Sequence, residues 1–295
     1  MPAASNYQSV SVGEWRLKLL SSLWTLELQK VVLELVNQQP WAKHPQTISL
    51  HLPGGQAEGA YLKVFHPAEG SAALKDVLRD SKAFHAWRQG MALSETGFDV
   101  PLTIAAGEQR RFRLLRRAFV LTRRVDGQAL QLFLRDLTKY GEDKLRFATK
   151  RACLKQAANL VRQFHLKGFV HGDMVASNLL VAQAGGSQPI FYLMDNDRTR
   201  RYPCWLPHSL WKRNLIQLNR MPLPGITLQD RVRFLHAYLS TTKLTSSDRR
   251  LARWLERKTR LRRQQCDGVD ASGDFRRLMS WPANFRKPAD IERVG

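Results

Sequence analysis

The sequence predicts an α+β fold with two lobes: a small strand-rich N-lobe over about residues 14–122 and a larger helical C-lobe over about residues 127–263. Strand patterns dominate before the turn dipeptide Asp126-Gly127, and helical patterns dominate after it. Segregated strands and helices are typical of α+β proteins, whereas a parallel sheet needs them to alternate. Residues 264–295 lack clear periodicity and are expected to form a loose tail.

Three patterns define the predicted N-lobe. Residues 47–65 read as a hairpin: one alternating strand, the turn Pro53-Gly54-Gly55, and a second strand at Tyr61–Phe65. Residues 76–94 read as a helix that Gly97 ends. Two further short strands, Phe112–Leu115 and Ala118–Thr122, are expected to pair.

An apolar-rich stretch from Trp15 to Val36 is interrupted by charged residues, and its longest uncharged run, Leu19 to Leu26, is too short to span a bilayer. We expect an amphipathic element packed on the domain, with an interfacial role as the alternative. In the C-lobe, Lys144 to Lys167 has a long helical pattern ended by Gly168, and the chain is helical and basic from about Leu206 onwards.

The composition limits the classes of partner. A formal net charge of +22 over 295 residues favours anionic partners such as nucleic acid, anionic lipid or phosphorylated sugars, and argues against cationic small molecules. Cys153, Cys204 and Cys266 are widely spaced and form no CxxC pair, so neither a zinc site nor a disulfide framework is indicated. We expect a reduced, cytoplasmic setting, and Met1–Gly13 has no signal-peptide pattern.

The segment Phe169–Val181 holds the pattern H-G-D-x4-N followed by an apolar run, and a second apolar run ends at Asp195. Phosphoryl transfer needs a carboxylate at the attacking hydroxyl and oxygen ligands for Mg²⁺. Asp173 supplies the first, and Asn178 with Asp195 supplies the second. Each residue alone could instead cap a turn; the joint spacing favours the chemical interpretation.

Lys63 lies in the middle of a predicted strand about 110 residues before Asp173. An ammonium group is costly in a buried strand unless it meets an anion. We therefore predict that Lys63 orients phosphate groups; the alternative is an edge-strand lysine facing solvent. His165 and His171 are expected to be hydrogen-bonded core residues, and His171 to support the loop that carries Asp173.

These residues resemble a known family. His171–Val181 together with Met194–Arg198 is similar to the lipopolysaccharide core kinases, which include heptose kinases and 3-deoxy-octulosonic acid kinases. Tyr61–Phe65, residues 81–101 and residues 218–238 agree more loosely. The resemblance implies a bilobal, protein-kinase-like fold that binds ATP and Mg²⁺ and phosphorylates a sugar hydroxyl of the lipopolysaccharide inner core.

The same resemblance implies roles for four site residues, and position and chemistry suggest the rest. Lys63 contacts the nucleotide phosphates, Asp173 is the catalytic base, and Asn178 and Asp195 bind Mg²⁺. Asp126, just after the expected hinge, is a candidate ribose contact. The arginines after the metal acid, Arg198, Arg200 and Arg201, are candidate acceptor-binding residues because a guanidinium suits phosphate and carboxylate groups; a solvated turn is the alternative.

The sequence departs from the family pattern twice. Ala86 stands where a helix glutamate usually pairs with the strand lysine; Asp76, Asp80 and Glu95 are the candidates to substitute for it, and Asp80 is the preferred one. No GxGxxG run precedes Lys63, and Gly54, Gly55 and Gly59 are the only candidates for a phosphate-covering loop. A pseudokinase scaffold of the same fold at an anionic membrane surface therefore remains an alternative.

A dense basic helix is expected near the C-terminus, with these cations: Arg249, Arg250, Arg253, Arg257, Lys258, Arg260, Arg262 and Arg263. Such a helix can lie on an anionic membrane, each cation contributing about 1 kcal/mol. It could instead follow a nucleic-acid backbone or be merely solvated. We expect a cytoplasmic enzyme, peripheral to the inner membrane, that binds lipopolysaccharide core or another anionic glycolipid.

Overall fold

The computed structural model divides the chain into two compact units. The first is Met1–Asp126 with Tyr192–Thr199, and the second is Gly127–Phe191 with Arg200–Gly295. The predicted lobe limits, 14–122 and 127–263, remain a prediction. The structure describes residues 6–42, 44–52, 59–67, 77, 79–138, 144–182, 189–203, 209–220 and 226–267.

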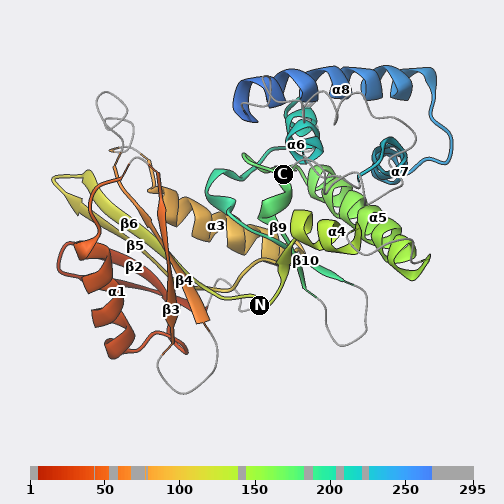
Figure 1. Cartoon of the computed structure of the whole chain (residues 1–295). Helices are drawn as coiled ribbons and strands as arrows, with labels where there is room; N and C mark the ends of the chain where they lie inside the picture. The colour runs from red at the N-terminus through yellow and green to blue at the C-terminus, as the bar shows by residue number, and fades with distance from the viewer. Residues whose placement is uncertain are drawn as a thin grey trace. The chain divides into compact units, whose positions relative to one another are not determined.

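A six-stranded antiparallel sheet forms the first unit, in the order β1-β2-β5-β6-β4-β3 (Figure 1). Its strands are β1 Tyr7–Val12, β2 Trp15–Leu20, β3 Gln46–His51, β4 Gly59–Phe65, β5 Thr103–Arg111 and β6 Leu114–Arg123. The predicted hairpin is confirmed, because β3 and β4 pair antiparallel with Thr47 opposite Lys63.

The predicted strand pair at 112–115 and 118–122 is wrong. Residues 114–123 form the single strand β6, which pairs with β5. Phe112 and Arg113 make the turn between them, with φ angles of 50° and 66°. Two consecutive positive φ angles usually recruit Gly, Asn or Asp, so Phe-Arg gave no turn signal.

Helices cover both faces of this sheet. On one face, Leu62 and Val64 of β4 are fully buried in a core with Val32 and Val36 of α1 (Leu26–Gln38). On the other face, Phe65 packs with Ala83 and Phe84 of α3 (Lys82–Glu95). Because successive strand side chains point to opposite faces, Lys63 lies on the α3 face.

The core-facing interpretation of Trp15 to Val36 is confirmed, since Trp15, Leu19 and Leu20 are buried. The stretch is not one element, however. Strand β2 ends at Leu20, and α1 begins after Thr25, whose hydroxyl accepts a hydrogen bond from the Leu28 N–H at 3.1 Å. Among the described residues, no helix combines the length and apolar character needed to cross a bilayer.

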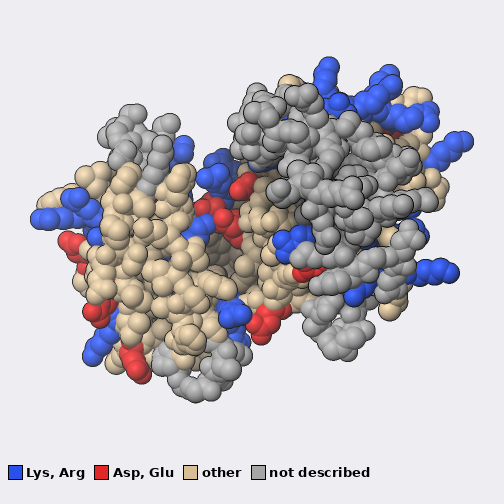
Figure 2. Space-filling view, in the orientation of Figure 1, with Lys and Arg blue, Asp and Glu red and all other residues tan. Residues whose placement is uncertain are grey.

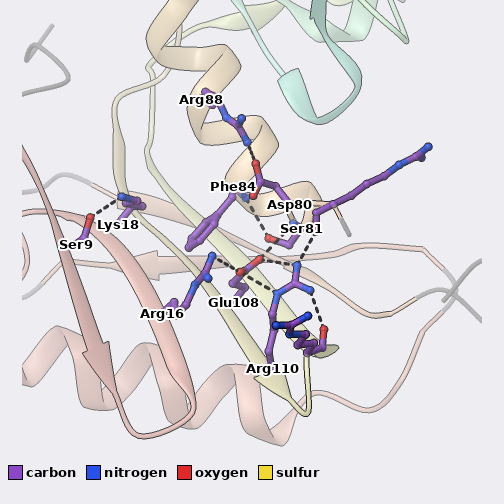
Figure 3. Close-up of polar contacts among 11 residues, drawn as sticks. Ser9, Arg16, Lys18, Asp80, Ser81, Phe84, Arg88, Glu108 and Arg110 are labelled. Carbon is purple, nitrogen blue, oxygen red and sulfur yellow. Dashed lines mark hydrogen bonds and ion pairs between the residues drawn. The ribbon is translucent and has the colours of Figure 1, made fainter. Parts of the chain in front are cut away.

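A buried carboxylate fixes the start of α3 (Figure 3). Glu108 of β5 is 1% exposed and accepts a hydrogen bond from the Ser81 backbone N–H at 3.2 Å. Arg110 and Arg16 lie 2.9 and 2.8 Å from its Oε1. Burial alone would raise the pKa of Glu108, but hydrogen bonds from Arg110 and Ser81 lower it below the ordinary value.

The N-cap of α3 is Ser81, whose side chain accepts from the Phe84 N–H. Residues 79–81 are not helical, so the helix predicted over 76–94 does not run unbroken from its predicted start. Its end is as predicted: Thr96 is the C-cap and Gly97 follows with φ 87°.

The second unit is mainly helical. It contains α4 Leu130–Thr138, α5 Lys144–Leu166, α6 Leu210–Asn219, α7 Leu228–Leu239 and α8 Ser246–Asp267. Its short strands are β7 Gln128–Ala129, β8 Phe169–Val170, β9 Leu179–Ala182 and β11 Arg200–Arg201; β10 Ile190–Leu193 crosses the unit boundary, and the 3-10 turns are η2 Ala176–Asn178 and η3 Asn196–Arg198. The predicted helix ending at Gly168 is confirmed by α5.

Two buried features hold these helices together. Lys150 of α5 donates to Asp230 of α7 at 2.6 Å, and both side chains are about 5% exposed or less. Arg231 and Arg263 donate to the Asn219 and Arg220 carbonyls at the end of α6, where cations are favourable. Burial, then the charge of Arg263, lowers the pKa of Arg231 to about 10.

Helix α8 differs from its prediction in two respects. Arg263, expected on the basic surface, is buried at 3% exposure against the end of α6. The helix also continues to Asp267, past the expected start of the tail at 264; residues 268–295 lie outside the described part of the chain.

Candidate active site

The predicted site residues fall into two groups, one in each compact unit. Lys63 and Asp195 belong to the first unit, and Asp173 and Asn178 belong to the second. The first group is built from ionised side chains, and the second is built around a loop held by amide groups.

Lys63 and two acids form what we call the lysine cluster: Lys63, Asp195 and Asp197. Lys63 Nζ donates to Asp195 Oδ1 and lies 3.5 Å from Asp197 Oδ2. The expectation that Asp80 pairs with Lys63 is wrong, because Asp80 forms an ion pair with Arg88 at the start of α3 (Figure 3). Asp76 lies outside the described residues.

The acids of the lysine cluster are presented by a tight turn after β10. Asp195 has a left-handed backbone, with φ 54° and ψ 58°, which is uncommon outside glycine and is often retained at functional sites. Its side chain is 38% exposed, whereas that of Asp197 is 8% exposed. Burial, then the negative charge of Asp195, raises the pKa of Asp197.

Several hydrogen bonds fix this turn within the first unit. Leu193 N–H donates to Asp99 O at 2.9 Å, and the Asn196 amide donates to Leu193 O at 3.0 Å. The Thr199 hydroxyl donates to Asn196 Oδ1 at 3.1 Å, and His85 Nε2 of α3 lies 2.7 Å from Thr199 O. The lysine cluster therefore sits on a turn that is anchored at both ends.

Asp173 lies on the loop between β8 and η2. Its N–H donates to His171 Nδ1 at 3.1 Å, so Nδ1 is the unprotonated ring nitrogen. The Asn178 amide donates to Asp173 O at 2.8 Å, which leaves Asn178 Oδ1, the atom suited to Mg²⁺, out of that hydrogen bond. The loop thus fixes its own acid and amide relative to each other.

The sequence analysis missed a second support, which we call the amide clamp: Asn214 and Gln217 of α6. Asn214 is fully buried; its Oδ1 accepts from the His171 N–H at 3.0 Å, and its Nδ2 donates to the His171 carbonyl. Gln217 Oε1 accepts from the Met174 N–H and Nε2 donates to the Gly172 carbonyl, both at 3.2 Å. The only available signal was a pair of amides three residues apart on an otherwise apolar helix face.

The two histidines behave as expected. His171 is buried and accepts from the Asp173 N–H. His165 Nε2 lies 3.1 Å from Asn214 Oδ1, and its Nδ1 lies 2.9 Å from the Tyr238 hydroxyl. Both are therefore hydrogen-bonded, His171 in the core and His165 at a half-buried position where it links the amide clamp to α7.

The candidate arginines and Asp126 lie at exposed positions. Arg198 is in η3, and Arg200 and Arg201 are in β11, which pairs with β8. The Arg201 guanidinium lies over the Phe169 ring at 5.2 Å. Asp126 is 96% exposed and 3.5 Å from Arg124. Of the candidate loop glycines, Gly59 begins β4 opposite His51, and Gly54 and Gly55 lie outside the described residues.

A comparison with protein families decides the identity of the chain. The profile of the "Lipopolysaccharide kinase (Kdo/WaaP) family" matches residues 72–238, which is more than half of the sequence and includes the Asp173 loop and Asp195. The chain belongs to this family. It is therefore a kinase of the Kdo/WaaP type, which transfers a phosphoryl group to a sugar hydroxyl of lipopolysaccharide, and the predicted family is confirmed.

Solved structures agree with the fold. A structure titled "WaaP in complex with acyl carrier protein" is 20% identical, covers 77% of this chain and 90% of its own, and has a TM-score of 0.57. The predicted α+β, kinase-like fold of this Kdo/WaaP family member is confirmed. A rhoptry antigen kinase domain from Toxoplasma gondii is 14% identical with a TM-score of 0.38, which is too distant to support any conclusion. No curated protein matches the chain significantly.

Proposed function

We propose that this chain uses ATP and Mg²⁺ to phosphorylate a heptose or 3-deoxy-octulosonic acid hydroxyl of the lipopolysaccharide inner core. The observation that carries the proposal is the Asp173 loop, whose backbone is held by the amide clamp at His171, Gly172 and Met174. A rigid loop favours catalysis because a positioned carboxylate reacts as an intramolecular group.

In this proposal Asp173 binds the acceptor hydroxyl and takes its proton. Its side chain is half-buried, and Gln217 Nε2 lies 3.4 Å from Oδ1. One carboxylate oxygen thus faces the clamp, and we assign the other to the acceptor hydroxyl. The hydrogen bond from the Asp173 N–H to His171 Nδ1 fixes the backbone from which this carboxylate extends.

The oxygen donors fit Mg²⁺, a hard cation that prefers carboxylate and carbonyl oxygens. Asn178 offers an amide oxygen, and Asp195 offers a carboxylate that its left-handed backbone leaves 38% exposed. Bound Mg²⁺–ATP supplies the transferable phosphoryl group, and the metal neutralises its negative charge. Lys63 would then orient the phosphates, and Asp126 would contact the ribose.

The acceptor side is assigned to the exposed arginines after Asp195. Arg198, Arg200 and Arg201 carry guanidinium groups suited to bidentate contacts with the phosphate or carboxylate groups of an anionic sugar. Arg201 is already oriented by the Phe169 ring and by a 3.4 Å contact to the Lys167 carbonyl.

The experiment is transfer from γ-labelled ATP to truncated lipopolysaccharide cores, one ending in heptose and one in 3-deoxy-octulosonic acid, beside protein and RNA acceptors. We expect one sugar core alone to be labelled, and Asp173→Asn to lower turnover by about 10²–10⁴ while retaining Mg²⁺–ATP binding. Asp248→Asn, an exposed acid of α8, is the matched control. No labelling of any sugar would favour the pseudokinase alternative.

The proposed docking surface is the exposed basic face of α8, which supports a location at the cytoplasmic surface of the inner membrane. Figure 2 shows Lys and Arg side chains gathered along this helix. Its exposed cations are Arg249, Arg250, Arg253, Arg257, Lys258, Arg260 and Arg262. Seven cations on one helix, each contributing about 1 kcal/mol, are enough to bind the helix to an anionic lipid surface.

An acyl carrier protein is a second candidate partner, because the similar protein WaaP has been solved in complex with one. A cavity of about 480 Å³ in the second unit is lined mainly by apolar residues of α4–α8, with Arg253, Arg257 and Arg260 and the acids Asp230 and Glu256 also in its wall. An apolar cavity next to arginines suits an acyl chain with an anionic group.

Binding to vesicles separates these partners. We expect flotation with vesicles rich in anionic lipid, loss of flotation in neutral vesicles, and weaker binding when Arg249 and Arg250 are changed to Glu. Acyl carrier protein and duplex RNA, added at several salt concentrations, are the competing ligands. Preferential RNA binding with a steep salt dependence would instead support the nucleic-acid alternative.

A further inference from the structure

Lys63 has an acidic partner that the sequence pattern did not reveal. In kinases the strand lysine usually pairs with a glutamate of the adjacent helix. Here α3 carries one acid, Glu95, at its last position, and Ala86 stands where the glutamate is expected. Asp80, just before α3, is paired with Arg88. The carboxylates beside Lys63 come from the turn after β10 instead.

The two acids of this turn are not equivalent. The Asp195 side chain is 38% exposed and reachable by a metal ion. The Asp197 side chain, in the 3-10 turn η3, is 8% exposed and faces Lys63. When Asp195 engages a metal ion, it can no longer neutralise Lys63. A second, buried carboxylate 3.5 Å from Nζ then remains to hold the ammonium group.

The surrounding turn keeps Asp197 in place. Asn196 and Thr199, on either side of Asp197 and Arg198, are hydrogen-bonded to each other and are both buried. The His85 bond to Thr199 O ties this turn to α3. The helix therefore contributes to the position of Asp197 through the backbone of the turn rather than by a glutamate of its own.

We propose that Asp197 is the positioning residue of Lys63, replacing the missing helix glutamate and holding Nζ for the nucleotide while Asp195 binds the metal. This inference rests on the proposed function only in that both involve a nucleotide. The role requires coupling between residues 63 and 197, which a merely structural carboxylate would not show.

A double-mutant cycle tests the coupling: Lys63→Met, Asp197→Asn and the double variant, each titrated with a fluorescent ATP analogue in Mg²⁺. We expect Asp197→Asn to weaken binding by about tenfold, a usual size for contacting charges, and the double variant to bind no worse than Lys63→Met. Thermal unfolding checks folding, and Asp197→Glu, which keeps the charge, should recover most of the affinity.

Two controls sharpen the test. Asp80→Asn, an acid in the same unit paired with another cation, should leave nucleotide affinity unchanged. The Mg²⁺ midpoint should shift in Asp195→Asn and stay unchanged in Asp197→Asn. Additive effects, an unchanged affinity in Asp197→Asn, a shifted Mg²⁺ midpoint in Asp197→Asn, or wild-type protein that binds no nucleotide would each overturn the proposal. Because no acceptor is present, failure of sugar phosphorylation leaves this outcome readable.

Discussion

The lysine cluster of the first unit and the Asp173 loop of the second are stabilised by different forces. Charges of opposite sign hold Lys63 near Asp195 and Asp197. Neutral amides hold the Asp173 loop, through hydrogen bonds from Asn214 and Gln217 to its backbone. The strength of an ion pair changes when a charged phosphate or metal ion binds beside it. A hydrogen bond between neutral amides carries no net charge and depends much less on bound ions.

This difference matches the tasks proposed for each group. When the nucleotide binds, Lys63 must leave Asp195 for a phosphate group, and Asp195 must leave Lys63 for Mg²⁺. The ion pair between them therefore has to be replaceable. Asp173 must keep one position through the reaction, and a buried clamp that does not titrate serves that purpose. A clamp made of carboxylates would have repelled Asp173 and favoured its protonation.

The largest expected effect is on the stability of the second unit. The variant tests whether a buried ion pair stabilises this unit, although neutral amides hold its Asp173 loop. Asp230→Asn leaves Lys150 buried without its carboxylate, so we expect the free energy of unfolding to fall by about 3–5 kcal/mol. Denaturation in urea measures this change. We expect the Asp173 loop, which Asn214 and Gln217 of α6 hold, to keep its structure in this variant.

The matched control exploits a repeated motif. Asp230 also caps α7 by a reciprocal pair of hydrogen bonds with Thr227. Asp248 forms the same pair with Thr245 at the start of α8 but lies at the surface, without a buried ion pair. Asp248→Asn should therefore have a much smaller effect, and equal losses in the two variants would mean that capping, not the buried ion pair, stabilises the unit.

A smaller effect is expected at the amide clamp itself. Asn214→Ala removes the partners of the buried His171 N–H and C=O groups, at a cost of about 1–3 kcal/mol. Because the loop that carries Asp173 loosens, kcat should fall more than the KM for ATP rises. Asn219→Ala, on the same helix but bonded to Thr259 of α8, should leave kcat unchanged; a parallel loss of kcat would argue against a specific clamp.

The sequence predicted what depends on residue type at fixed spacing. The H-G-D-x4-N pattern, the lysine strand and the α5 helix each follow from local periodicity or from groups that the chemistry requires. The partners of these groups depend on tertiary contacts between distant segments, and local rules do not reveal them. Asp197 lies 134 positions from Lys63, and Asn214 lies 43 from His171.

Two errors show the same limit. Asp80 was the preferred partner of Lys63 because it was expected to lie nearest the end of the lysine strand, yet it pairs with Arg88 at the start of α3. The turn at Phe112 and Arg113 was missed because its backbone is dictated by the pairing of β5 with β6 over their whole length, and that pairing overrides the unfavourable φ angles of two bulky residues.

The smallest expected effect is on the pH dependence of stability. It distinguishes contacts made by charged carboxylates, which titrate, from those made by the neutral amides of the clamp, which do not. The pKa of Glu108 is lowered in the folded state, so its stabilising contribution is present above its unfolded pKa of about 4.3 and is lost as pH falls through the folded value. Asp230 behaves in the same direction. Wild-type stability should therefore decline on acidification below about pH 4.

Glu108→Gln keeps an acceptor for the Ser81 N–H but removes the charge that Arg16 and Arg110 share. We expect a loss of about 1 kcal/mol at neutral pH and a shallower decline below about pH 4, measured by urea denaturation across pH. Gln217→Glu is the opposite probe, because it puts a titratable group into the clamp and should make the Asp173 loop pH-dependent. If Glu108→Gln leaves the decline below about pH 4 unchanged, Glu108 does not cause that decline, and other acids with a lowered pKa, such as Asp230, must account for it.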